Sequence, residues 1–337
     1  MQANQHLQVM NKSYEFLREI LTTPAWNIEY NRGAMLARQV HANLIGHTPM
    51  NDTVTMDKTT QRMEVLVRKA SDRKTFEREN ATRLMSKPLF KEQAKQFSSK
   101  IMVGNARSLS WWDELDEDDQ VINLLHVEGP ITRNGGACSY GSKDIRDQML
   151  YCADMPNCIG HILILDSPGG SAFASNDFEQ ATDAVRNAKQ SSIGLIDGMC
   201  CSACMDAASM LDEVYFVHPK DMIGCIGTYY CDFTLKNGDQ NSITQEVFRE
   251  VYADISEDKN LIFRQLAEGD ESGVKEWVNK FAQEFRDRVK ARRPNTPDEW
   301  LKGKTLDASE TVGIWTQGQS NLQGCIERIL QLNSPRK

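Results

Sequence analysis

The stretch SSIGLIDGMCCSACMDAAS, residues 191–209, carries the pattern that decides the fold. It begins as a short apolar run, turns at Asp197 and Gly198, and continues as a series of small residues typical of a buried helix. A strand that passes directly into a helix is the repeating element of α/β proteins. Ser202 lies at this junction, where the sequence predicts the N-terminus of a helix.

Short apolar runs and helical patterns alternate on both sides of this stretch. Helices are predicted at 142–154 and 174–189, where apolar residues recur at helical spacing. The apolar runs between and beyond them predict strands: VINLLHVEG, IGHILILDS, SSIGLIDG, EVYFVH, IGTYYCDF and VFREVYAD. Continuous apolar strands that alternate with helices predict an α/β fold with a mainly parallel sheet covered by helices.

The chain outside this core is more charged and is predicted to be mostly helical. Residues 1–118 form a predicted helical N-terminal extension, whose segment 58–107 holds 13 Lys and Arg against 5 Asp and Glu. The acidic run WWDELDEDD ends near a predicted domain boundary, so the α/β domain is expected at 119–332 and a short tail at 333–337. Further helices are predicted at 271–292 and at the C-terminus.

Composition narrows the class of protein. The 337 residues contain no apolar run long enough to cross a membrane and begin without the pattern of a secretory signal, so a soluble cytoplasmic protein is expected. Nine cysteines, an odd number scattered through apolar runs, predict reduced core thiols rather than disulfides. No HExxH motif and no pair of CxxC motifs occurs, so neither a metal nor a cofactor is expected. Aromatic residues are sparse in segment 58–107, which disfavours nucleic acid as a partner.

LILDSPGGSAFAS, residues 163–175, predicts a strand that ends in two glycines. At the carboxyl edge of a parallel sheet, glycines leave backbone N–H groups unobstructed, and such groups can stabilise a developing oxyanion. Taken alone, Gly169 and Gly170 fit a tight turn equally well. For Ser202 taken alone, helix capping is the favoured interpretation, because a serine at a helix N-terminus is a common capping residue. The two stretches together favour catalysis, since adjacent parallel strands bring their carboxyl ends to one edge of the sheet.

Several stretches in this order resemble serine peptidases similar to signal peptide peptidase A, within the Clp protease and crotonase superfamily. They are HVEGPI, LILDSPGGSAFAS, DGMCCSACMDAAS, DEVYFVHP and IGCIGT, and GKTLDASETVGI is similar to the segment that closes that domain. The resemblance covers roughly residues 120–330 and implies the repeated ββα core of the superfamily. It also implies that Ser202 is the nucleophile, and that the backbone N–H groups of Gly169 or Gly170 and of Ala203 form the oxyanion hole.

A serine hydroxyl is a poor nucleophile until a base accepts its proton. None of the six histidines lies in a polar loop after Ser202, which disfavours a Ser-His-Asp relay. The resemblance implies a lysine downstream of the nucleophile, and Lys259 is the only lysine in VYADISEDKN, with Lys236 and Lys304 as alternatives. Such a lysine is neutral only if burial lowers its pKa from about 10.4, although SEDKN is typical of the exposed start of a helix.

The resemblance implies a serine endopeptidase with a Ser202–Lys259 dyad that acts on an extended polypeptide and forms a homo-oligomer. Soluble members with a helical N-terminal extension resemble the head maturation proteases of tailed phages and prophages. Processing of capsid or scaffold proteins in the bacterial host cytoplasm is therefore expected, with segment 58–107 docking an acidic capsid or scaffold partner. Two alternatives stay open: an inactive assembly or scaffold subunit with the same fold, and a crotonase-type acyl-CoA enzyme, which needs no serine nucleophile.

Overall fold

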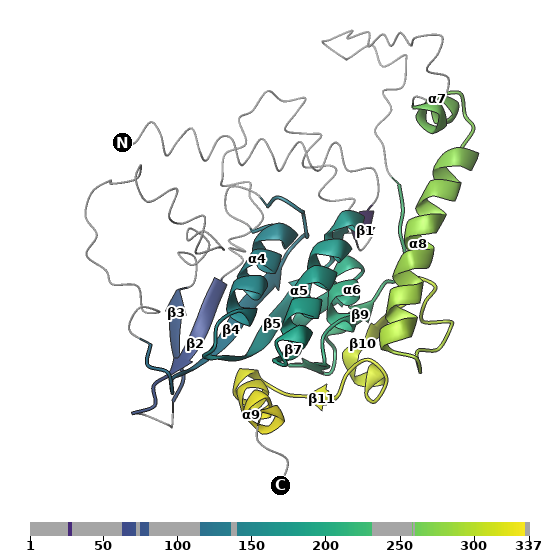
Figure 1. The fold of residues 1–337 in the computed structure, drawn as a ribbon. Coiled ribbons are helices and arrows are strands. Elements are labelled where there is room, and N and C mark those ends of the chain that lie inside the picture. Colours follow the sequence, from purple (N-terminus) through teal and green to yellow (C-terminus); the bar gives the residue numbers. More distant parts are fainter. Residues whose placement is uncertain are drawn as a thin grey trace, which may run out of the picture.

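The computed structural model describes residues 64–71, 75–77, 115–135, 140–230, 258 and 260–333, and the backbone alone of residues 26–28, 63 and 78–80. Helices and strands alternate through the central part of the chain (Figure 1). The strands are β1 (Trp26–Ile28), β2 (Met63–Arg68), β3 (Glu77–Asn80), β4 (Gln120–Glu128), β5 (Cys158–Ser167), β6 (Gly169–Ser171), β7 (Ser191–Cys201), β8 (Glu213–Phe216), β9 (Met222–Gly224), β10 (Thr305–Asp307) and β11 (Gly318–Gln319). The helices are α4 (Ser142–Ala153), α5 (Ser175–Asn187), α6 (Ala203–Ser209), α7 (Leu261–Ala267), α8 (Ser272–Arg292) and α9 (Leu322–Leu332), with the short 3-10 helices η3 (Ala172–Ala174) and η4 (Ala308–Thr311).

A nine-stranded sheet forms the centre of the molecule. Its main strand order is β10-β9-β7-β5-β4-β2-β3, with β8 paired to β7 and β11 paired to β8. The pairings β4–β5, β5–β7, β7–β8 and β7–β9 are parallel. The long strands β4, β5 and β7 are buried over most of their length, which explains why their sequences are almost continuously apolar. The predicted α/β fold with a mainly parallel sheet is confirmed.

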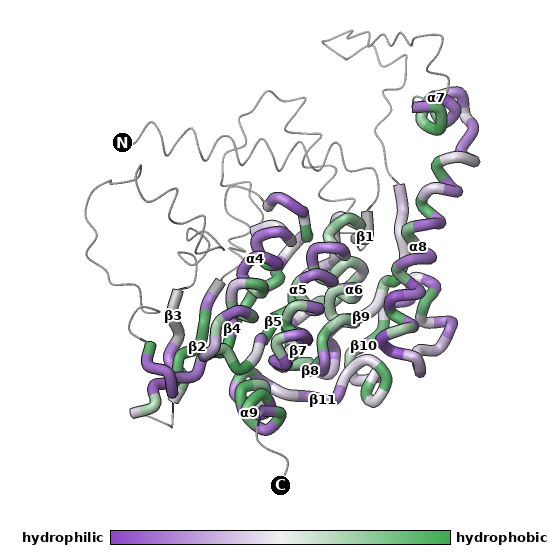
Figure 2. Tube along the Cα trace, viewed as in Figure 1, coloured by the Kyte–Doolittle hydropathy of each residue, from purple (hydrophilic) through white to green (hydrophobic). Residues whose placement is uncertain are grey.

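Helices cover both faces of this sheet. α4, α5 and α6 lie along one face (Figure 1), where apolar side chains such as Met149 and Phe178 join Leu163 of β5 in one buried cluster. α9 covers the other face, where Ile326 and Ile329 belong to a second cluster with residues of β4, β5 and β7. In Figure 2 the helices alternate between hydrophobic and hydrophilic residues along their length, as expected for helices with one buried face.

Two strands of the sheet lie within the segment predicted to be a helical extension. β2 pairs antiparallel with β4, and β3 pairs antiparallel with β2, so residues on both sides of the predicted boundary share one sheet. Val65, Leu66 and Val67 are buried, and the burial of this short run outweighs the charged residues around it. The helical prediction was wrong for β2 and β3, and also for β1. The other residues of the range 1–114, apart from 69–71 and 75–76, lie outside the described residues.

The C-terminal third confirms the helices that the sequence predicts, and α8 spans the predicted range 271–292 almost to the residue. The predicted strand IGTYYCDF is wrong at residues 226–228, which have no regular structure, and VFREVYAD lies outside the described residues. No helix within the described ranges combines the length and the apolar character that crossing a bilayer requires.

Candidate active site

The carboxyl ends of β5, β7 and β9 meet at one edge of the sheet, and Ser202 lies there. Ser167 at the end of β5 is paired with Cys200, and Cys201 at the end of β7 is paired with Gly224 of β9. Ser202 follows directly and precedes the first residue of α6. Its backbone N–H donates to the Gly224 carbonyl oxygen at 2.8 Å. The predicted sequence of strand, serine and helix is therefore present.

The backbone of Ser202 is strained. Its φ is 55° and its ψ is −118°, a conformation that costs a residue with a side chain about 1–3 kcal/mol. Two hydrogen bonds hold it in place: the N–H donates to Gly224, and the carbonyl oxygen accepts from the Asp206 N–H at 2.9 Å. A strained serine at a turn from strand to helix presents its hydroxyl at the end of the sheet, as in the nucleophile elbow of α/β-hydrolases.

The Ser202 hydroxyl has no polar partner within the described part of the chain. The residue is 1% exposed, and its Oγ makes no hydrogen bond there. A capping serine accepts a hydrogen bond from an amide of the first helical turn, and Ser202 does not. Helix capping therefore does not explain this residue. An unpaired buried polar group costs about 1–3 kcal/mol of stability, so the Ser202 hydroxyl destabilises the fold.

Gly169 and Gly170 form the bend beside α6, and each is required for a different reason. β6, which contains both, is in contact with α6. Gly169 has a φ of 101°, a left-handed backbone conformation that favours glycine. Gly170 has an ordinary φ, but a Cβ at this position would lie 1.9 Å from the carbonyl oxygen of Ile131. The bend therefore depends on close contact between the backbones of Gly170 and Ile131.

The backbone N–H groups of the two glycines face opposite sides of β6. The Gly169 N–H donates to Ser167 Oγ at 3.1 Å, and the Gly169 carbonyl oxygen accepts from the Ile131 N–H at 2.8 Å. The Ser171 N–H donates to the Ile131 carbonyl oxygen, also at 2.8 Å. Because alternate residues of a strand turn their backbone groups to opposite sides, the N–H of Gly170 faces away from Ile131.

Ala203 brings a second backbone amide to this edge. It is the first residue of α6, so its N–H has no acceptor within the helix. Because β6 and α6 are in contact, the amides of Gly170 and Ala203 belong to two neighbouring elements. Two such donors on one polarised oxygen are the requirement of an oxyanion hole.

An ion pair fixes the helix that follows Ser202. Asp206 is fully buried, and its Oδ2 accepts from Arg288 Nη2 of α8 at 2.6 Å and from Ser175 Oγ of α5 at 2.6 Å. The N–H of the same residue binds the carbonyl oxygen of Ser202. Asp206 therefore ties the strained serine to α5 and α8.

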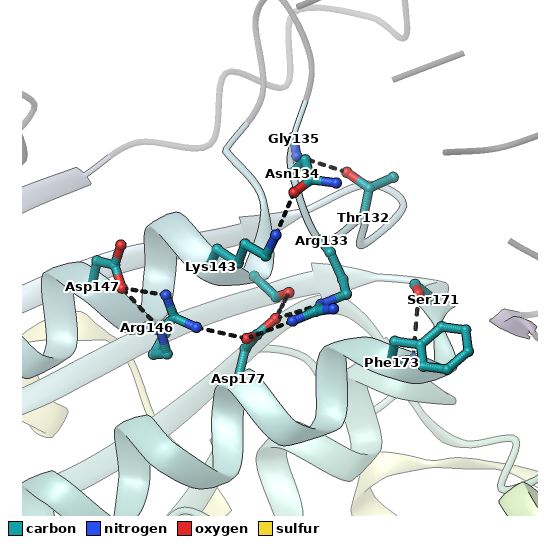
Figure 3. A network of polar contacts seen from close by, with 11 residues as sticks. Thr132, Arg133, Asn134, Gly135, Lys143, Arg146, Asp147, Ser171, Phe173 and Asp177 are labelled. Carbon is teal, nitrogen blue, oxygen red and sulfur yellow. Dashed lines mark hydrogen bonds and ion pairs between the residues drawn. The ribbon is translucent and has the colours of Figure 1, made fainter. Parts of the chain in front are cut away.

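A second ion-pair network holds the segment behind the glycine bend (Figure 3). Asp177 of α5 accepts from Arg133 Nε at 3.2 Å, from Arg146 Nη1 at 3.0 Å and from Ser142 Oγ at 2.7 Å. Arg133 follows Ile131 by two positions, so these bonds fix the backbone against which Gly170 packs. Sequence reasoning missed both networks, because their members come from helices and loops far apart in the chain.

Of the three lysines considered as the base, the structure describes one. Lys259 and Lys236 both lie outside the described residues. Lys304 is described, and its carbonyl oxygen accepts from the Cys225 N–H at 2.8 Å, one strand beyond Gly224. Lys304 is an exposed residue, so its side chain is solvated.

The described histidines are engaged elsewhere or exposed. His126 Nδ1 lies 3.1 Å from Glu128 Oε1, and His161 Nε2 lies 2.8 Å from Gln190 Oε1. His218 is exposed. Within the described residues, no histidine forms a hydrogen bond with the Ser202 hydroxyl.

The thiols on either side of Ser202 are packing residues. Cys200, Cys201 and Cys204 are fully buried, and none of the three takes part in a disulfide among the described residues. Burial, together with a hydrogen bond to Cys204, raises the pKa of Cys200 well above its ordinary value, which keeps that group neutral. Within the described residues, no group of three or more His, Cys, Asp or Glu side chains is arranged to hold a metal ion.

Comparisons with known proteins add little to this geometry. No family model matches the sequence, and no curated protein matches it. Among solved structures, the chain is similar to a point mutant of ClpP1 from Listeria monocytogenes, with 11% sequence identity and a TM-score of 0.37 over 60% of this chain and 93% of that chain. A likeness of this size says nothing about activity.

Proposed function

We propose that the protein is a serine endopeptidase of the Clp protease and crotonase superfamily, with the repeated ββα core of that superfamily and with Ser202 as its nucleophile. One observation carries the proposal: a serine in a strained turn keeps a buried hydroxyl without a partner in the described structure. Stability alone does not favour such a residue, because both the strain and the unpaired hydroxyl weaken the fold. Catalysis does favour it, since a nucleophile must be free to form a new bond.

In the proposed reaction, Ser202 Oγ attacks the carbonyl carbon of a peptide bond while a base takes the hydroxyl proton. The carbonyl oxygen becomes an oxyanion and accepts hydrogen bonds from the amides of Gly170 and Ala203. The intermediate collapses, the amine leaves with the proton from the base, and an acyl-serine remains. Water then attacks the acyl group by the same route and restores the hydroxyl.

The Gly169 amide does not fit the role of oxyanion donor, because it already binds Ser167 Oγ. Its role is structural: the left-handed bend at Gly169 turns the chain so that Gly170 faces the substrate side. The Ser167 hydroxyl also donates to the Gly129 carbonyl oxygen at 2.6 Å, and this hydrogen bond holds the bend in place. The proposed oxyanion hole therefore consists of Gly170 and Ala203.

Lys259 is the proposed base. A lysine accepts a proton only when it is neutral, so its surroundings must exclude water. Its neighbours Asp258 and Asn260 are exposed in the single chain, and a second subunit is therefore proposed to cover this segment. This requirement supports the proposed homo-oligomer, in which the dyad is complete only after assembly.

The proposed substrate is an extended polypeptide bound along the outer side of β6, where it adds a strand. Capsid or scaffold proteins of a phage or prophage are the proposed physiological substrates, with segment 58–107 as the docking region for an acidic partner. The alternatives remain an inactive scaffold subunit and a crotonase-type acyl-CoA enzyme. The unpaired Ser202 hydroxyl favours the peptidase over both, because neither alternative uses it.

A fluorophosphonate probe tests the proposal, because it forms a covalent bond only with an activated serine. We expect the assembled full chain to gain one probe by intact mass, and Ser202→Ala to gain none. Ser209→Ala is the matched control: it removes another buried hydroxyl of α6, one that donates to the Asp206 carbonyl oxygen at 2.7 Å, and it should still be labelled. If long exposure to concentrated probe leaves the full chain unlabelled, the peptidase is excluded in favour of the scaffold subunit.

A further inference from the structure

A segment from the N-terminal part of the chain lies along the outer side of the glycine bend. β1 pairs antiparallel with β6 in a separate two-stranded sheet. Trp26 lies opposite Ser171, Asn27 opposite Gly170 and Ile28 opposite Gly169. Figure 1 shows β1 close to the ends of α5 and α6, at the edge of the molecule where the carboxyl ends of the strands lie.

The register between β1 and β6 shows which backbone groups of the two strands face each other. In an antiparallel ladder, facing residues alternate between pairs that exchange hydrogen bonds and pairs that do not. The Gly169 carbonyl oxygen and the Ser171 N–H both form hydrogen bonds with the backbone of Ile131 on the inner side. Gly170 is therefore the residue whose N–H and C=O face β1, and Asn27 is the residue opposite to it.

We infer that residues 26–28 occupy the substrate-strand site of this protein and act as its intramolecular inhibitor. The inference rests on the proposed function, because it identifies the outer side of β6 as the place where a substrate binds. In the register given by the pairing, the backbone carbonyl group of Asn27 faces the backbone N–H of Gly170. Asn27 therefore takes the place of the residue whose carbonyl oxygen enters the oxyanion hole.

Occupation of this site by a weakly held strand has two consequences for the proposed reaction. Ser202 is 1% exposed although the proposed reaction needs a polypeptide to reach it, and a segment paired with β6 excludes a substrate strand from the same site. The strand is also weakly held, because it is three residues long and belongs to a sheet of two strands, which is marginal by itself in water. A tethered segment nevertheless competes with free peptide, since covalent linkage makes its binding an intramolecular event.

Binding of a synthetic peptide tests the inference without any chemistry. The peptide is TTPAWNIEYN, residues 22–31, carrying a fluorophore at its N-terminus, and its binding to full-length chains is measured by fluorescence anisotropy. Three chains are compared in the Ser202→Ala background, which keeps the peptide intact: the unchanged segment, Asn27→Pro and Asn27→Ala. Proline removes the N–H of residue 27 and fixes its φ, so it breaks the ladder with Gly170. Alanine keeps the backbone groups and is the matched control.

The Asn27→Pro chain is expected to bind the peptide at least tenfold more tightly than the chain with the unchanged segment, because its own segment no longer competes. The Asn27→Ala chain is expected to bind as weakly as the unchanged one. Equal affinities for all three chains would overturn the inference, as would an Asn27→Ala chain that binds as tightly as Asn27→Pro.

Probe labelling of the same segment variants, now with Ser202 present, separates this inference from the proposed function. Faster labelling of Asn27→Pro than of the unchanged chain supports both. Tighter peptide binding by Asn27→Pro, with no labelling of any chain, supports an occupied strand site and rejects the peptidase. Equally fast labelling of all chains, with equal peptide affinities, supports the peptidase and rejects the inhibitor.

Discussion

Replacing Gly170 by alanine is the most direct test of the oxyanion hole. A Cβ at this position would lie 1.9 Å from the Ile131 carbonyl oxygen and 2.6 Å from the Ile131 N and C atoms. Real Cβ contacts lie beyond 3.0 Å, so the two backbones must separate by about 1 Å. We expect this separation to reduce the free energy of unfolding by about 1–3 kcal/mol, the usual cost of overpacking.

The same displacement moves the Gly170 amide away from the oxyanion. Loss of one such donor slows the chemical step by about 100- to 1,000-fold, so probe labelling and peptide hydrolysis should slow by this factor. The assay measures both the labelling rate and the denaturant midpoint. Gly160→Ala is the matched control, because its Cβ would lie 2.8 Å from side-chain atoms of Ile329 on the opposite face of the sheet. It should cost stability while leaving the labelling rate unchanged. A folded Gly170→Ala chain that is labelled as fast as the unchanged chain would refute the assignment of Gly170 as a donor.

Three further predictions concern the elements around the site. Asp206→Asn leaves the charge of Arg288 without its partner, and we expect thermal denaturation to show a loss of about 3 kcal/mol, with labelling impaired because the start of α6 is released. The hydrogen bond from Arg328 lowers the pKa of the Glu213 carboxyl below its ordinary value of 4.5, so this pair stabilises the fold above that pH, and its contribution is lost as the pH falls through the lowered pKa; Arg328→Gln should flatten this acid dependence in denaturant titrations. Burial and the hydrogen bond to Glu213 raise the pKa of Tyr215 to about 12, so phenolate absorbance of this residue should appear about two pH units later than in Tyr215-containing peptides, where the pKa is about 10. Because the folded state favours the protonated phenol, Tyr215 stabilises the fold below about pH 10, and this contribution is lost as the pH rises from about 10 to about 12.

The sequence predicted the central sheet because parallel strands have a recognisable composition. Strands buried on both faces are apolar throughout, and the stretches that contain Leu163 and Ile193 show this directly. The serine at the turn and the two glycines were found for the same reason, since their place after a strand is visible in the order of the residues. The carboxyl ends of these strands do meet at one edge.

Three other features could not be predicted from local patterns. β2 is a short apolar run within a basic segment, and only the free edge of β4 turns it into a strand. The choice between Gly169 and Gly170 depends on the hydrogen bond that the Gly169 amide already donates to Ser167 Oγ. Pairing of β1 with β6 joins residues more than a hundred positions apart, and three residues carry too little pattern to reveal it.

The burial of Ser202 argues for an opening step before any substrate binds. A residue that is 1% exposed cannot meet a polypeptide in the closed state, so part of its cover must leave. The sheet beneath it and the cluster around α6 belong to the main core and open only at a cost near that of global unfolding. β1 belongs to neither, because it contributes three residues to a separate sheet of two strands. Among the described elements near this edge, release of β1 therefore requires less free energy than opening of the sheet or of α6, and the affinity of an incoming strand must exceed that of the tethered segment for it to take the place of β1.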